Sequence, residues 1–187
     1  MDLLSVFLAT QTRLINIPLL LLFNFAGYLL SATANSLTAT EISMSTLILS
    51  YFSFFAFGGT NAISSVDLSN AYNGVSGYNI GAVGFLTFAS NWIGPIYWSS
   101  TGIVLLARKQ AVDHAVFLRH FLVLSTFCCV AVGGVMAACT ALRTHLFIWT
   151  VFSPKFLYSA AWATAWHLGV NIGVGSVLSW ASRKSLR

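Results

Sequence analysis

Long runs of apolar residues alternate with short polar segments along the whole chain. An apolar helix needs about 20 residues to cross a hydrocarbon core of ~30 Å. Several runs approach or exceed this length, and they predict an all-α protein: a polytopic membrane helical bundle of about five transmembrane helices. The predicted spans cover about 14–30, 42–58, 80–107, 115–142 and 154–180.

Prolines mark where some of these helices begin or break. Gly94 and Pro95 interrupt the third run, and a kink or a break is expected there because proline lacks an N–H and clashes with the preceding turn. The Ser153-Pro154 pair predicts the start of the last helix, since serine is a good N-cap and proline suits the first helical position. Residues 1–12 are too short to cross a membrane and lack the basic start of a secretory signal, so we interpret them as a retained lead-in.

Composition excludes several classes of protein. Only 7% of the 187 residues are charged, and 57% are hydrophobic, whereas soluble domains carry roughly 25% charged residues. We therefore expect residues 1–187 to form a single membrane domain with no soluble catalytic domain. The net charge of +5 is scattered between apolar runs, so we expect no nucleic-acid partner, which would require a clustered basic surface.

Lysine and arginine also predict the orientation of the chain, because they are enriched in cytoplasmic loops. The 108–114 connector and the C-terminal tail carry more of them than the loops predicted for the opposite side. We therefore expect the C-terminus in the cytosol, and the 58–79 loop and the 143–155 connector on the lumenal or exterior side.

The sequence predicts no catalytic and no metal-binding residues. Acids and histidines are scattered, and none of the spacings typical of hydrolases, phosphate-binding loops or zinc proteases occurs. The cysteines Cys128, Cys129 and Cys139 share one apolar run without a zinc-ligand spacing, so we interpret them as small apolar residues of a helix.

Two polar segments remain as candidate contact sites for a lipid, a glycan or a partner. In the 58–79 loop, Asp67 is the only acid, and it is accompanied by Asn61, Asn70 and Asn73. This loop either forms a polar cup that binds a lipid headgroup or a glycan, or its side chains bond to their own backbone.

The second candidate is the 143–155 connector, where basic and aromatic residues occur together. Its candidate contacts are His145, Trp149 and Lys155. Such residues either anchor a segment at the membrane interface or contact an anionic lipid phosphate. Farther along, Gly169 and Gly173 allow close helix approach, either within the chain or against a partner.

The segments 54–79, 91–100 and 145–162 resemble, in the same order, the C-terminal membrane region of fungal GPI ethanolamine phosphate transferase 2. The resemblance implies a multi-pass protein of the endoplasmic reticulum membrane in GPI-anchor biosynthesis. This family moves phosphoethanolamine from phosphatidylethanolamine onto the second mannose of the GPI precursor. Its catalysis belongs to a lumenal domain with a threonine nucleophile and zinc, and nothing in these 187 residues matches that domain.

The resemblance therefore implies a membrane portion that positions the lipid substrates and binds a small membrane partner subunit. No cofactor is expected in this chain, and the catalytic domain is expected on a separate or longer polypeptide. The sequence alone leaves open whether the chain is itself part of an enzyme. The alternatives are an independent small multi-span carrier and an assembly subunit that holds a partner through its glycine-containing helix faces.

Overall fold

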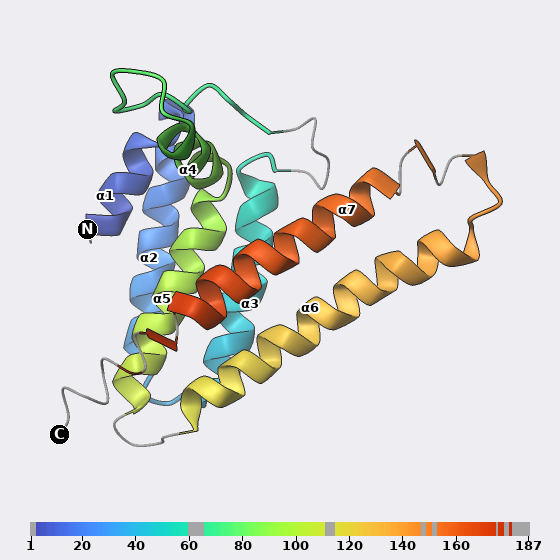
Figure 1. The fold of residues 1–187 in the computed structure, drawn as a ribbon. Coiled ribbons are helices and arrows are strands. Elements are labelled where there is room, and N and C mark those ends of the chain that lie inside the picture. The colour runs from blue at the N-terminus through green and yellow to red at the C-terminus, as the bar shows by residue number, and fades with distance from the viewer. Residues whose placement is uncertain are drawn as a thin grey trace. The chain divides into compact units, whose positions relative to one another are not determined.

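The computed structural model describes residues 3–59, 66–110, 115–146, 149–150, 153–174, 176–177 and 180. Every regular element within this part of the chain is helical, as the apolar pattern predicts. Figure 1 labels its helices in chain order. The chain divides into two compact units.

The first unit is drawn from Met1–Thr38, Ser45–Thr60 and Ser65–Gly102. The short helix α1 packs against α2, so the lead-in segment belongs to a folded helical unit. Its elements are α1 (Leu3–Thr10), the 3-10 helix η1 (Leu14–Asn16), α2 (Ile17–Thr33), most of α3 (Ala39–Ala56), α4 (Ile80–Asn91) and the first half of α5 (Ile93–Gln110).

The third predicted span is two helices, α4 and α5. The break lies at Trp92, the residue between α4 and α5, and the prediction of a break at Gly94-Pro95 is wrong by a few residues. The reason is that Pro95 falls in the first turn of α5, where a missing N–H has no intrahelical partner to lose. At the other end of α4, Asn79 Oδ1 accepts hydrogen bonds from the N–H groups of Gly81 at 3.0 Å and Ala82 at 3.1 Å.

Aromatic and aliphatic side chains from α1, α2 and α5 form the core of the first unit. Its buried members are Leu8, Leu20, Phe23, Ile93, Tyr97 and Trp98. The rings of Tyr97 and Trp98 meet edge to face with centroids 5.2 Å apart, a favourable arrangement of aromatic quadrupoles. A glycine in α2 permits the approach of α5: a Cβ added to Gly27 would lie 2.5 Å from Tyr97 Oη.

The second unit comprises Ala39–Met44, Asn61–Ser64 and Ile103–Arg187. It contains the start of α3, the end of α5, α6 (Val116–Ala141), α7 (Ser153–Trp162) and the π-helix η4 (Ala163–Val174). Helix α6 contacts both α7 and η4. Helix α7 begins at Ser153, which confirms the start predicted from the Ser-Pro pair.

Two buried histidines of the second unit bond to serine hydroxyls on neighbouring helices. His120 Nδ1 lies 2.8 Å from Ser43 Oγ, and His167 Nε2 lies 2.8 Å from Ser125 Oγ. Both imidazoles are almost fully buried. Polar side chains that bond across helices in this way connect α6 to its neighbours inside an otherwise apolar unit.

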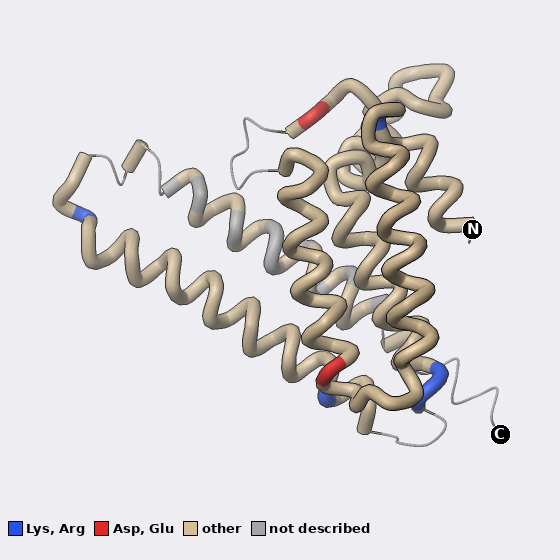
Figure 2. The backbone as a smooth tube through the Cα atoms, turned by 180° about the vertical axis from the view of Figure 1, so that it is seen from behind, with Lys and Arg blue, Asp and Glu red and all other residues tan. Residues whose placement is uncertain are grey.

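Large apolar side chains are exposed along the helices of both units. On α2 they include Phe25 and Tyr28, and on α6 they include Leu122 and Val130. Such extensive apolar exposure is unusual for a water-soluble monomer. The charged positions lie at helix ends and in connecting segments, so the helices themselves present apolar residues to their surroundings (Figure 2).

Within the described residues, two helical stretches are long and apolar enough to cross a membrane: Leu14–Thr33 and Val116–Ala141. They coincide with the predicted spans 14–30 and 115–142. The predicted 42–58 span coincides with α3, and the 154–180 span begins with α7 and η4. The helices at these positions are confirmed, and the number of about five membrane crossings stays a prediction.

Candidate functional site

The polar loop after α3 is held to the end of α4 by one asparagine side chain. Asn91 Oδ1 accepts a hydrogen bond from the Asp67 N–H at 2.8 Å, and Asn91 Nδ2 donates to the Asp67 carbonyl at 2.8 Å. The same amide nitrogen also donates to the Thr87 carbonyl at 2.8 Å, inside α4. Asn91 therefore satisfies both backbone groups of Asp67, and it fixes the position of that residue relative to the helix.

The Asp67 carboxylate pairs with an arginine that is distant in sequence. Arg13 Nη2 lies 2.6 Å from Asp67 Oδ2, and the Ser69 N–H donates to Asp67 Oδ1 at 2.9 Å. The hydrogen bonds from Ser69, followed by the nearby charge of Arg13, lower the pKa of Asp67 below its usual value. The carboxylate is therefore charged at neutral pH, and its charge is balanced by the adjacent guanidinium.

Asn70 and Asn73 extend this arrangement toward the end of α1. Asn73 Nδ2 donates to Asn70 Oδ1 at 3.2 Å and to the Thr10 carbonyl at 3.1 Å. The described part of the loop, 66–79, has no helix or strand and contains turns and bends. The loop is thus anchored by side chains to α1 as well as to α4.

Asp67 and its neighbours Arg13, Asn70 and Asn91 line a cavity of about 300 Å³, which we call the Asp67 cup. Its polar lining includes Gln11, Thr12, Arg13, Asp67, Asn70 and Asn91, and its apolar lining includes Ile15 and Phe57. Gln11 and Thr12 are only 3% and 9% exposed. Their side-chain atoms Gln11 Oε1 and Thr12 Oγ1 have no hydrogen-bond partner among the described residues, an arrangement that is costly unless another group satisfies them.

The structure brings together three of the seven predicted contact residues: Asp67, Asn70 and Asn73. His145 and Trp149 belong to the second unit, where both side chains are exposed and Trp149 Nε1 donates to the Arg143 carbonyl at 3.1 Å. Asn61 lies outside the described residues.

Lys155 lies in α7, and its side chain is not among those that the structure describes. The exposed indole of the 143–155 connector fits either of the roles considered for that segment, an interface anchor or a lipid contact.

The residues of the cup that sequence reasoning missed include Gln11, Thr12, Arg13 and Asn91. The first three form a polar triplet between two apolar segments, and that interruption is the signal that could have identified them. Asn91 carries no comparable signal, because an asparagine near a helix end is common and its partner lies 24 residues away.

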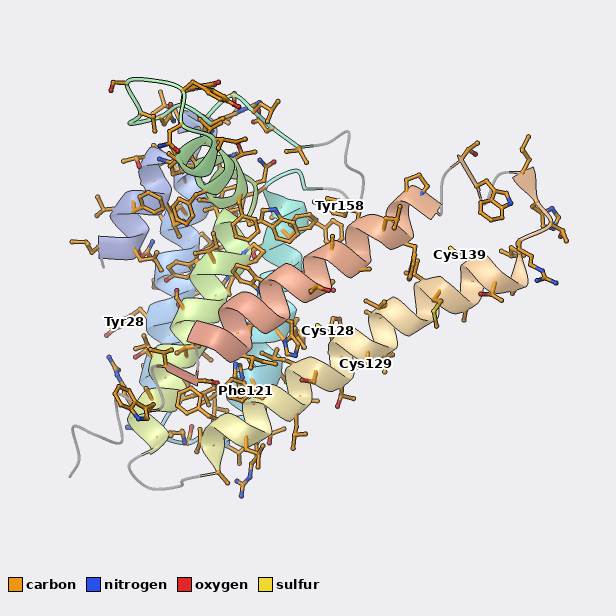
Figure 3. The ribbon with its side chains drawn as sticks, viewed as in Figure 1. Tyr28, Phe121, Cys128, Cys129, Cys139 and Tyr158 are labelled. Atoms are coloured by element: carbon orange, nitrogen blue, oxygen red, sulfur yellow. The ribbon has the colours of Figure 1, made fainter. Side chains whose placement is uncertain are left out.

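Catalytic groups do not converge anywhere in the described part of the chain. Among those residues, no group of three or more His, Cys, Asp or Glu side chains is placed to hold a metal ion. Cys128, Cys129 and Cys139 are free thiols spaced along α6 (Figure 3). The chemistry that the cup supports is the binding of a ligand through hydrogen bonds.

Helices with exposed apolar surfaces and charges at their ends define a membrane protein, and the cup is its candidate functional site. Comparison with known families identifies the family: residues 1–184 match the GPI ethanolamine phosphate transferase membrane region. The chain belongs to this family.

Curated relatives agree with the family match. The chain is 45% identical over 169 residues to GPI ethanolamine phosphate transferase 2 of Aspergillus oryzae, covering 90% of this chain and 19% of the relative. It is 43% identical over 176 residues to the protein of that name in Aspergillus fumigatus, covering 92% and 22%.

The chain is also 45% identical over 134 residues to GPI ethanolamine phosphate transferase 2 of Saccharomyces cerevisiae, covering 68% of this chain and 16% of the relative. The chain thus spans about a fifth of the length of the relatives that it matches. No solved structure matches significantly.

Proposed function

We propose that these 187 residues form the membrane region of a GPI ethanolamine phosphate transferase 2, which adds phosphoethanolamine to the second mannose of the GPI precursor. The observation that carries this proposal is the family match over residues 1–184. Relatives of that name at 43–45% identity over about nine-tenths of the chain support it.

In this proposal the region is a single multi-pass domain of about five transmembrane helices in the endoplasmic reticulum membrane. The C-terminus faces the cytosol, and the Asp67 loop and the 143–155 connector face the lumen. The distribution of lysine and arginine along the sequence supports this orientation. In this orientation the cup faces the lumen, the side on which the family's phosphoryl transfer takes place.

The role that we assign to the region is to position lipid substrates and to bind a small membrane partner subunit. Phosphatidylethanolamine and the GPI precursor are the substrates in this scheme, and a lumenal zinc-dependent domain carries out the transfer. The Asp67 cup supports the positioning role, because its side chains converge on one cavity and two of its buried polar atoms have no partner in the described chain. The exposed His145 and Trp149 are the candidate contacts of the 143–155 connector.

A chimera tests this function. The 187 residues replace the matching segment of the Aspergillus oryzae enzyme, and the chimera is expressed in a fungal strain lacking that enzyme. We expect it to restore phosphoethanolamine on the second mannose, measured by mass spectrometry of GPI glycans. The 187 residues expressed alone should not restore it. A chimera that reaches the membrane at normal abundance and leaves the glycans unmodified would contradict the proposal.

Point variants of the same chimera test the contact residues. Asp67→Ala and Lys155→Ala should lower phosphoethanolamine transfer without lowering protein abundance. The matched control is Lys109→Ala, since Lys109 lies in the last turn of α5, in a segment predicted to be cytosolic. Wild-type transfer by Asp67→Ala and Lys155→Ala, as in the control, would assign both residues to local structure alone.

A further inference from the structure

The buried floor of the Asp67 cup offers two hydrogen-bonding atoms that the described chain does not use. Gln11 Nε2 is turned toward Thr10 Oγ1, 3.4 Å away, which leaves the carbonyl oxygen Oε1 as the free atom of that amide. An amide oxygen can only accept, whereas the Thr12 hydroxyl can donate and accept. A ligand that satisfies both must therefore carry a donor together with a second polar group, at the depth of these two buried residues.

The charges of the cup balance each other. Arg13 and Asp67 form an ion pair at 2.6 Å, and their side chains are 60% and 38% exposed, so the pair lies at the rim. Asp67 already accepts from Ser69 and Arg13. A phosphate would have to compete with this carboxylate for the guanidinium, and an ammonium would have to compete with the guanidinium for the carboxylate. The cup therefore favours an uncharged ligand.

The rest of the lining suits a small ring that bears hydroxyl groups. Asn16 and Asn70 also line the cavity, and each of these amides has both donor and acceptor atoms. The Asn91 amide is already used in its bonds to Asp67 and Thr87. Phe57 and Ile15 give the cavity an apolar wall, against which the C–H face of a sugar ring gains dispersion contacts. A volume of about 300 Å³ lies at the lower end of the range for small-molecule sites.

We infer that the Asp67 cup binds a neutral, hydroxyl-rich ring, a hexose or a cyclitol, with a ring hydroxyl donating to Gln11 Oε1 and a second hydroxyl bonding to Thr12 Oγ1. This inference rests on the proposed function, because it assigns the cup to the polyol part of a substrate instead of to its phosphate or ammonium. The Arg13–Asp67 pair then closes the rim, and Asn91 holds Asp67 in place for that role.

The test uses the full 187-residue chain in phosphatidylcholine nanodiscs and ligand-observed NMR. The probes are methyl α-mannoside, myo-inositol and O-phosphoethanolamine, added separately. We expect at least one of the two polyols to bind and O-phosphoethanolamine not to bind. Preference between mannoside and inositol shows whether the ring comes from a glycan or from an inositol headgroup.

Variants of the floor separate recognition from folding. Gln11→Leu and Thr12→Val should each weaken polyol binding roughly tenfold, because each leaves a ligand hydroxyl without its partner. Thr12→Ser should keep most of the binding, since it retains the hydroxyl. Thr140→Val is the matched control, because Thr140 is an exposed residue of α6 whose hydroxyl bonds to the Met136 carbonyl within the same helix.

Three results would overturn the inference in a chain that retains its helix content by circular dichroism. The first is binding of O-phosphoethanolamine that Arg13→Gln abolishes, the second is the absence of polyol binding, and the third is polyol binding that neither floor variant weakens. Restored transfer by the chimera together with any of these results leaves the proposed function intact and refutes only this assignment. Polyol binding by the chain, together with no transfer by the chimera, supports the assignment of the cup and refutes the proposed function.

Discussion

The contact that most directly controls the geometry of the cup is the pairing between Asn91 and the backbone of Asp67, and Asn91→Ala removes it. The variant loses a hydrogen bond from the Asp67 N–H and one to the Asp67 carbonyl, both 2.8 Å long. Each neutral hydrogen bond contributes about 1 kcal/mol net, so the loop should lose about 2 kcal/mol of attachment. That value corresponds to a roughly 30-fold larger population of the detached loop.

Hydrogen–deuterium exchange measured by mass spectrometry, with the chain in lipid nanodiscs, detects this change at the Asp67 amide. We expect exchange of a peptide covering 66–70 to accelerate by about the same factor. Thr87→Val is the control, because its hydroxyl bonds only to the Val83 carbonyl within α4. Unchanged exchange at Asp67 in an Asn91→Ala chain with intact α4 would refute the role that we give to this side chain.

Two further predictions concern charge and packing. Hydrogen bonding from Ser69 lowers the pKa of Asp67 below its ordinary value of 3.8. The stabilisation from the charged carboxylate should therefore persist at pH 5 and be lost only as the pH falls below 3.8, through the lower pKa of the folded state. Carboxyl ¹³C NMR of aspartate-labelled chain measures this pKa, and a midpoint at or above 3.8 would contradict the prediction. Gly27→Ala should lower the Tm in detergent, since its Cβ would lie 2.5 Å from Tyr97 Oη and overpacking costs about 1–3 kcal/mol. Adding Tyr97→Phe to Gly27→Ala should restore most of the lost Tm. Gly84→Ala is the control, because its added Cβ meets no atom within 4 Å. Equal Tm values for all the variants would show that α2 does not need a glycine at position 27.

The positions of the helices could be predicted from the sequence because apolar runs of helical length have few alternatives in a chain with so little charge. The exact position of the break between α4 and α5 could not be predicted from the sequence. A proline marks either a break or the first turn of a new helix, and here Pro95 occupies the first turn after a break at Trp92. Choosing between these two readings requires knowing how Trp92 and Ile93 pack, and both side chains are buried.

The candidate site was predictable only in part, for a similar reason. Asp67, Asn70 and Asn73 share one loop, so composition alone identifies them. Arg13 and Asn91 reach Asp67 from other segments, through the packing of α1 and the end of α4. Side-chain pairs between distant segments depend on tertiary structure, and a single sequence contains no local pattern that reveals them.

The segment between α1 and α2 changes character within a few residues, and this has a practical consequence for handling the protein. Thr12 is 9% exposed, whereas Leu14 and Ile15 are 84% and 82% exposed. Since Ile15 also lines the cup, an amphiphile that covers this exposed side chain would lie beside that cavity. Solubilising agents that carry sugar headgroups, such as alkyl maltosides, would compete there with an added polyol, so purification in a glycan-free amphiphile is the appropriate starting point for any affinity measurement.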